Sequence, residues 1–130
     1  MRWRDVIKRV RTLLNSDEQF TGAMGGKHIY RNGDMTEVRI PGLFWTIVAD
    51  VEGENTVTVR VQFDLWHNDW DAYIIAETRI RALLDPQDAD MPLDLDGLKM
   101  FSSLVDSGDM DDHEPGVIHR VLDFVFTPHK

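Results

Sequence analysis

The sequence contains no cysteine, which removes several kinds of chemistry from consideration. Without thiols the chain has no disulfide framework, no thiolate metal site and no cysteine nucleophile. Long apolar runs are also lacking, because no stretch approaches the roughly 20 apolar residues that a membrane-spanning helix needs. The first ten residues, MRWRDVIKRV, mix charged and apolar positions and do not resemble a signal peptide. We therefore expect a soluble protein of a reducing compartment, with no membrane partner.

Basic side chains are scarce relative to acidic ones, and the imbalance is local. The 130 residues include 23 acids and 14 Lys or Arg, for a net charge of −9. Residues 85–114 hold ten of the acids and a single base, Lys99, so they carry the whole excess. The sequence thus predicts a neutral domain with one acidic segment. Because phosphates repel such a chain, we do not expect a broad nucleic-acid-binding surface.

The size and apolar content indicate one domain. A chain of 130 residues with 42% hydrophobic residues is long enough to bury a core without cross-links. We therefore treat residues 1–130 as a single domain, with acidic loops within 85–116.

The N-terminal segment predicts an amphipathic helix over residues 3–14. Its apolar residues recur at the spacing of one helical stripe, and its polar positions are strongly basic. That basic face is either solvated or binds a partner, and the residues that we single out as candidate contacts are Arg4, Lys8 and Arg11.

Two strand-like runs, 43–51 and 56–66, predict a β-hairpin. The second run alternates apolar and polar residues strictly, so that one face is buried. A three-residue loop, Gly53 to Asn55, keeps eight alternating apolar residues of the two runs on one face, whereas a two-residue loop slips the register and exposes half of this core. The expected register pairs Trp45, Ile47, Ala49 and Val51 with Phe63, Val61, Val59 and Val57, respectively.

The rest of the chain predicts one more helix and three more strands. The helix runs from Trp70 to Leu84, capped by Asn68 or Asp69 and stopped by Asp85-Pro86. Its expected apolar face contains Trp70, Tyr73, Ile74, Ile80, Leu83 and Leu84. The strands are 28–31, 100–106 and 117–127, with loops at 15–26, 86–99 and 107–116.

The order α-β-β-β-α-β-β indicates an α+β fold, a mostly antiparallel sheet with two helices. The closing strand is apolar on both faces, which is typical of a central strand or of one covered by a partner.

No set of residues predicts catalysis, a cofactor or a metal. Asp94, Asp96 and Gly97 match part of a calcium loop, but Pro92 replaces a ligand and no bidentate Glu follows. The histidines lack ligand spacing on one helical face. One alternative stays open, a metal-dependent enzyme that uses His113 and His119 with the neighbouring acids. A small α+β ligand-binding domain is another, and a closed apolar pocket would favour it.

One face of the predicted hairpin carries large side chains opposite the core. With the expected register, Phe44, Val48, Arg60 and Trp66 share it. Aromatic and Arg side chains clustered on a sheet are typical of an interface, and the alternative is that a helix or loop covers them.

The segment TVTVRVQFDLWHNDWDAYIIAETRIRALL, residues 56–84, resembles a known family. It is similar to a strand of the form "aRVQIDVWA" followed directly by a helix ending in "LAERVRALL" in the tail terminator, or tail completion, proteins of long-tailed bacteriophages. The GGKHIYR segment and the closing HRVLDFVF strand resemble the same family. The acidic stretch 85–114 and the tryptophans at 45, 66 and 70 depart from its pattern.

The resemblance implies a structural, non-enzymatic protein at the head-proximal end of a virion tail, assembled in the host cytoplasm. It implies a ring, typically of six copies, that caps the tail tube, stops its polymerisation and joins head-completion or connector proteins. Another head-completion or neck module is the alternative. DNA would be passing cargo, so acids such as Asp109, Asp111 and Asp112 line the bore or contact a neighbouring subunit.

Overall fold

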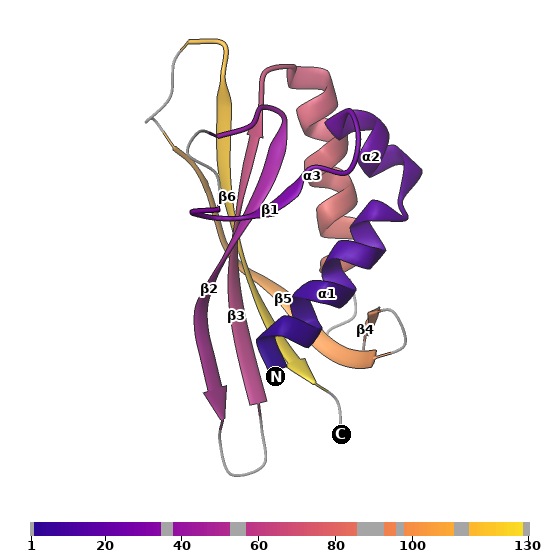
Figure 1. Cartoon of the computed structure of the whole chain (residues 1–130), viewed down its shortest axis with the longest axis vertical. Helices are drawn as coiled ribbons and strands as arrows, with labels where there is room; N and C mark the ends of the chain where they lie inside the picture. Colours follow the sequence, from indigo (N-terminus) through magenta and orange to yellow (C-terminus); the bar gives the residue numbers. More distant parts are fainter. Residues whose placement is uncertain are drawn as a thin grey trace.

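The computed structural model describes residues 2–34, 38–52, 57–85, 93–95, 98–110 and 115–128. Over these residues three helices accompany one six-stranded sheet in the order β1-β2-β3-β6-β5-β4 (Figure 1). The strand pair β1–β2 is parallel and the other four pairs are antiparallel. The elements are α1 (Arg2–Asn15), α2 (Glu18–Met24), β1 (Ile29–Arg31), β2 (Gly42–Glu52), β3 (Val57–His67), α3 (Trp70–Leu84), β4 (Leu93–Leu95), β5 (Leu98–Asp109) and β6 (Ile118–Pro128).

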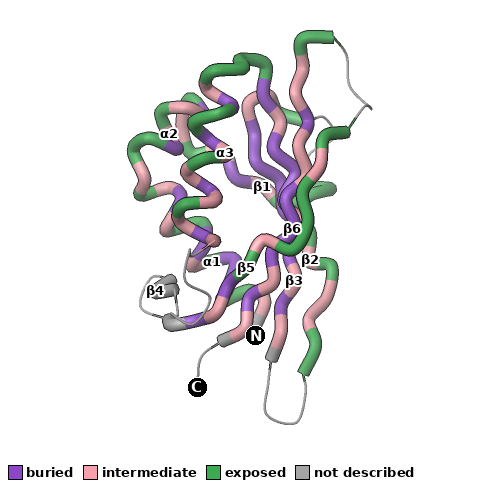
Figure 2. The backbone as a smooth tube through the Cα atoms, turned by 180° about the vertical axis from the view of Figure 1, so that it is seen from behind, coloured by how far each residue is buried: buried purple, intermediate pink, exposed green. Residues whose placement is uncertain are grey.

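The predicted class, α+β with a mostly antiparallel sheet, is confirmed. The helices lie together against one face of the sheet, and the buried residues lie between the two layers (Figures 1 and 2). The closing strand β6 lies between β3 and β5, so its two-sided apolar pattern is that of a central strand.

Helix α1 buries the predicted stripe. Val6, Ile7, Val10 and Leu14 are at most 4% exposed, and they pack into the core between helices and sheet. Burying side chains of this size contributes about 1.5–3 kcal/mol each relative to exposure. The opposite, basic face of the helix stays exposed, as the amphipathic pattern predicts.

The predicted loop over residues 15–26 is wrong, because Glu18–Met24 form α2. Asp17 caps this helix by accepting a hydrogen bond from the backbone N–H of Phe20, and Gly25 ends it in the left-handed conformation. Phe20 is fully buried. A seven-residue helix is marginal alone, so its packing against α3 stabilises it, and sequence periodicity does not reveal that contact.

The hairpin register is half as predicted. Trp45 pairs with Phe63 and Ile47 with Val61, but an irregularity at Val48 shifts the rest by one residue. Ala49 then lies opposite Arg60 instead of Val59. A bulge inserts one extra residue into one strand, and alternation read from a single strand does not contain it.

Helix α3 begins after Asp69, which caps it as predicted, but its buried face is rotated. The buried residues are Tyr73, Ala76, Ile80 and Leu84, whereas Trp70 and Ile74 are exposed. Glu77, one turn after Tyr73 on this helix, accepts a hydrogen bond from the Tyr73 hydroxyl at 2.8 Å.

The acidic region contains more strand than expected. Strand β5 spans Leu98–Asp109 where 100–106 was predicted, and the short β4 pairs with it inside the predicted loop 86–99. Hydrogen bonding to β6 keeps the additional C-terminal residues of β5 extended. Their side chains are Ser, Gly and Asp, which have low strand propensity, so the sequence did not predict this part of the strand.

Candidate interaction surfaces

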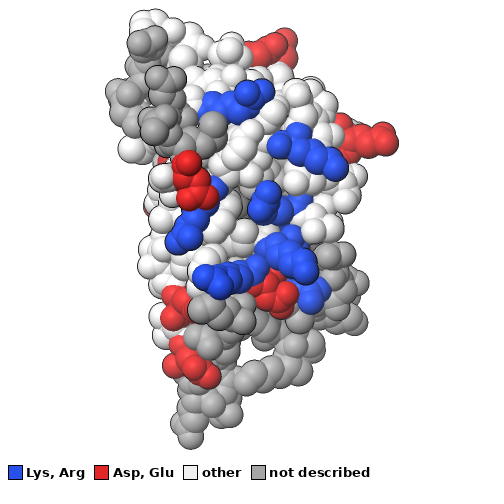
Figure 3. Space-filling model, in the orientation of Figure 1, with Lys and Arg blue, Asp and Glu red and all other residues white. Residues whose placement is uncertain are grey.

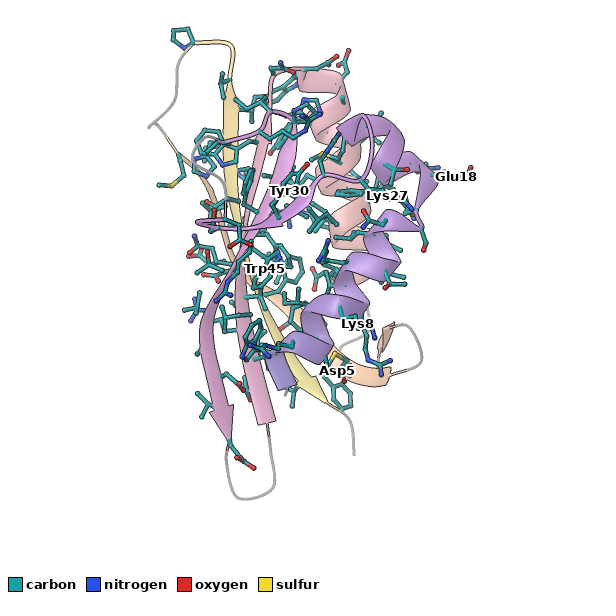
Figure 4. All side chains as sticks on the ribbon, in the orientation of Figure 1. Asp5, Lys8, Glu18, Lys27, Tyr30 and Trp45 are labelled. Carbon is teal, nitrogen blue, oxygen red and sulfur yellow. The ribbon has the colours of Figure 1, made fainter. Side chains whose placement is uncertain are left out.

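A groove of about 780 Å³ opens between α1 and the β1–β2 edge of the sheet. Trp3, Ile7 and Asn15 of α1 form one wall, and Tyr30 and Trp45 of the strands line the other. In Figure 4 the labelled Lys8 of α1, Tyr30 of β1 and Trp45 of β2 lie around it, together with Lys27 from the segment between α2 and β1. The groove brings N-terminal helix residues together with two neighbouring strands.

The groove is lined by five cations, and Asp34 is the acidic residue among its lining side chains. Figure 3 shows basic side chains gathered over this middle region of the molecule. The three helix cations singled out from the sequence are among them, and folding adds two more from the β1 region. The five are Arg4, Lys8, Arg11, Lys27 and Arg31.

These five cations have no carboxylate partner among the residues that the structure describes. Arginines elsewhere in the fold are paired: Arg60 with Asp123, Arg79 with Asp17, and Arg120 with Glu77, at 2.7–2.9 Å. Unpaired positive charge is therefore concentrated in the groove, whereas the three arginines named outside it are neutralised by carboxylates.

Aromatic rings hold two of the groove arginines in place. The guanidinium carbon of Arg31 lies 5.4 Å from the ring centre of Trp3 and 5.5 Å from that of Trp45. Arg4 lies 5.1 Å from the Trp3 ring. A cation over an aromatic face is stabilised without losing its charge, so the N–H groups of these arginines stay available to an anion.

Two polar atoms of the groove residues are buried without a hydrogen-bond partner in the described part of the chain. They are the indole N–H of Trp45, a residue only 7% exposed, and the side-chain oxygen of Asn15. An unpaired buried donor costs about 1–3 kcal/mol, so this wall is not optimised as a closed core.

The second predicted surface lies on the sheet face opposite the helices, and its four residues differ in exposure and in contacts. Phe44 is buried against Tyr30, with ring centres 5.4 Å apart, so it is not exposed in this chain. Val48, at the bulge, is 50% exposed. Arg60 is tied to Asp123, and Trp66 stacks on His119 at 3.7 Å.

A buried polar cluster lies on this same face. His119 Nε2 is 2.7 Å from Asp64 Oδ1, and the Asn32 side-chain amide donates to the other oxygen of Asp64 at 2.9 Å. Asp64 is 8% exposed and His119 5%. Mutual hydrogen bonding satisfies the cluster, which joins the end of β1 to β3 and β6.

The metal alternative finds no support in the described residues, where no group of three metal-ligating side chains occurs. His67 contacts the backbone carbonyl of Ala23 at 2.7 Å, and His28 lies 2.9 Å from the Tyr30 hydroxyl. His113, the other histidine of that hypothesis, lies outside the described residues. None of the described helices is long and apolar enough to cross a membrane.

The acidic candidates are only partly described. Asp109, at the end of β5, is largely exposed and accepts a hydrogen bond from Arg120 at 3.2 Å. Asp111 and Asp112 lie outside the described residues, as do Asp88, Asp90 and Glu114.

No protein-family model matches the chain, and no curated protein matches it. Among the solved structures that match, one shares the fold across nearly the whole chain. It is a chain from the virion of a native gene transfer agent particle, with a TM-score of 0.65 and 12% sequence identity. The match covers 93% of this chain and 92% of that one. At this identity the likeness shows the shared fold.

Sequence reasoning missed Lys27, Arg31 and the two tryptophans as parts of one surface. Residues 27 and 31 lie on a short segment that is placed beside α1 only by the parallel pairing of β1 with β2. A signal was the five Arg residues that accompany Trp3 within residues 2–31, because Arg and Trp together are typical of binding surfaces.

Proposed function

We propose that this chain is a structural protein of a virion, and more specifically a tail terminator of a phage-like particle. It assembles as a ring, with six copies as the expected number, at the head-proximal end of the tail. There it caps the tail tube, stops tube polymerisation and offers a surface to head-completion or connector proteins, while DNA passes through.

The observation that carries this proposal is the fold likeness to a chain of a gene transfer agent virion over 93% of the sequence. The resemblance of residues 56–84 to tail terminators supports the same role. Those residues form β3 and the α3 helix that follows it directly, the strand–helix order of the resemblance.

The charge distribution suits a ring. A basic groove and an acidic segment on the same chain are unlike patches, and contacts between unlike patches close into rings when the rotation between subunits allows it. Such a role needs interaction surfaces and no catalytic residues.

Electron microscopy combined with analytical ultracentrifugation tests the proposal. We expect rings of the purified protein, or rings on the ends of added tail tubes, and tubes that no longer elongate once capped. Rings that bind the portal side of empty heads but not tube ends would instead assign the chain to another neck module. A protein that stays monomeric and ignores tube ends would refute the ring-forming role.

A further inference from the structure

We propose that the basic groove between α1 and β1–β2 binds the acidic segment, residues 85–114, of a second copy of this chain. This inference rests on the proposed function, because it names the contact that would join subunits of the ring. The groove and the segment are the two halves of a heterologous interface.

The first argument is charge. Five cations line the groove without a carboxylate partner among the described residues, whereas the other arginines named above are paired within the fold. Residues 85–114 contribute ten acids and one base, and this excess equals the net charge of the chain. One copy thus carries a cationic site and an anionic segment that match in sign.

The second argument is preorganisation. Arg31 lies against the rings of both Trp3 and Trp45, and Arg4 also lies over the Trp3 ring, so the aromatic rings orient both guanidinium groups before binding. Side chains that are already placed lose less conformational freedom when a ligand binds. A planar guanidinium held in this way presents paired N–H groups with the geometry of a carboxylate.

The third argument is the volume and the lining of the groove. About 780 Å³ accommodates several residues of an extended peptide. Trp3 and Ile7 on the helix side and Tyr30 and Trp45 on the strand side give the groove apolar walls, against which the side chains of a peptide can pack.

A second copy fits these features better than nucleic acid. DNA would bring phosphates to the groove, but it would also meet the ten carboxylates of 85–114 on every copy. An acidic peptide from a neighbouring copy brings carboxylates to the five groove cations and offsets part of the negative excess of the segment.

Peptide binding tests the inference without requiring a ring. The probes are fluorescently labelled peptides of residues 85–98 and 106–114, and versions with every Asp and Glu replaced by Asn or Gln. Anisotropy with the full-length protein is expected to show saturable binding of at least one acidic peptide, weakening as salt is raised, and none of the neutral versions.

Lys8→Glu and Arg11→Glu change exposed groove cations. Arg39→Glu is the control for charge reversal outside the groove, because Arg39 is exposed, contacts His28 and does not line the groove. We expect each groove variant to weaken peptide binding about tenfold, since reversal replaces an attraction with a repulsion. The control is expected to bind within about twofold of the parent, and circular dichroism checks that all three variants fold.

The outcomes separate the inference from the proposed function. Peptide binding that depends on Lys8 by a protein that never caps tubes would keep the groove contact and remove the terminator role. Rings that form equally well from the parent and the Lys8→Glu variant, with no peptide bound, would overturn the inference. Lys8-dependent binding of a single-stranded oligonucleotide but of neither peptide would overturn it too and assign the groove to nucleic acid.

Discussion

His119 and Asp64 are joined across two neighbouring strands, with Nε2 of the histidine 2.7 Å from Oδ1 of the aspartate. Both side chains are buried, and Trp66 covers the imidazole with a parallel ring 3.7 Å away. Asp64 lies on β3, 55 residues before His119 in the chain, so only the folded sheet brings the two side chains together. This contact makes His119 part of the framework that holds β1, β3 and β6 together.

Replacing His119 with Ala is expected to lower the free energy of unfolding by about 1–3 kcal/mol. The reason is that Asp64 stays buried after losing a hydrogen-bond partner. Urea denaturation followed by tryptophan fluorescence measures the change. Ser103→Ala, at an exposed position of β5, is the control and should stay within about 0.5 kcal/mol of the parent. An unchanged midpoint for His119→Ala would show that the pair contributes nothing.

Metal analysis addresses the enzyme alternative directly. Because His119 is engaged by Asp64 and Trp66, we expect no stoichiometric transition metal in protein purified without chelators. Inductively coupled plasma mass spectrometry measures the content, and zinc addition is expected to leave the melting temperature unchanged. One equivalent of bound metal, lost in a His119→Asn variant, would revive the enzyme hypothesis.

Two isoleucines of α3 distinguish the observed helix face from the one expected from the sequence. Ile80 is fully buried and Ile74 is 46% exposed, although the apolar stripe contained both. We expect Ile80→Ala to cost about 2–5 kcal/mol of unfolding free energy because it leaves a cavity. Ile74→Ala should cost less than about 1 kcal/mol, mostly through apolar area. Equal losses in chemical denaturation would contradict the rotation of this helix.

The Asp17–Arg79 pair makes stability depend on pH. The hydrogen bond from Arg79, 2.7 Å from the Asp17 carboxylate, holds the pKa of Asp17 below its usual value of 3.8. A lowered folded pKa means that the carboxylate stabilises the fold above its ordinary pKa and loses this effect as pH falls through the folded value. Asp17→Asn, which still caps α2, should therefore be less stable than the parent at pH 7.

The same variant carries the test of that pH dependence. The stability difference between parent and Asp17→Asn should shrink as acid protonates Asp17, as measured by urea unfolding at a series of pH values. Arg79→Gln is expected to lose the same pH-dependent component, because it removes the other partner. A difference that stays constant from pH 7 to pH 2 would mean that the ion pair is not its origin.

A triple change to Asn at Asp109, Asp111 and Asp112 distinguishes the two roles considered for the acidic segment. If the segment docks into the groove of a neighbouring copy, the variant should assemble at a higher protein concentration, and added salt should affect it less. Sedimentation velocity measures this. If the acids instead line the bore, the rings should form normally while genome passage slows, as followed by DNA delivery from reconstituted particles.

Much of the local structure was predictable because it depends on near neighbours. The α1 stripe, the Asp69 cap, the strict alternation of β3 and the apolar β6 all follow from spacing within one element. The α2 helix, the Val48 bulge and the rotated face of α3 did not follow from it. Each depends on what a distant segment presents, such as the contact of Arg79 with Asp17.

The candidate site likewise contains some residues that the sequence predicted and others that only the fold brings together. Arg4, Lys8 and Arg11 were identified from one amphipathic helix, whereas Lys27 and Arg31 join them only through the β1–β2 pairing. Phe44 and Trp66 were correctly placed opposite the core by their parity in the strands, but the sequence did not reveal that Tyr30 and His119 cover them.

The sequence by itself determined the α+β class, the amphipathic first helix, the central closing strand and the confinement of negative charge to residues 85–114. These are properties of composition and of periodicity, which backbone geometry imposes within each element. Only the tertiary structure decided which cations lie in one groove and which polar groups are paired. Those outcomes depend on contacts between residues that are far apart in the chain. Such contacts form, and contribute to stability, only when the helices have packed on the sheet.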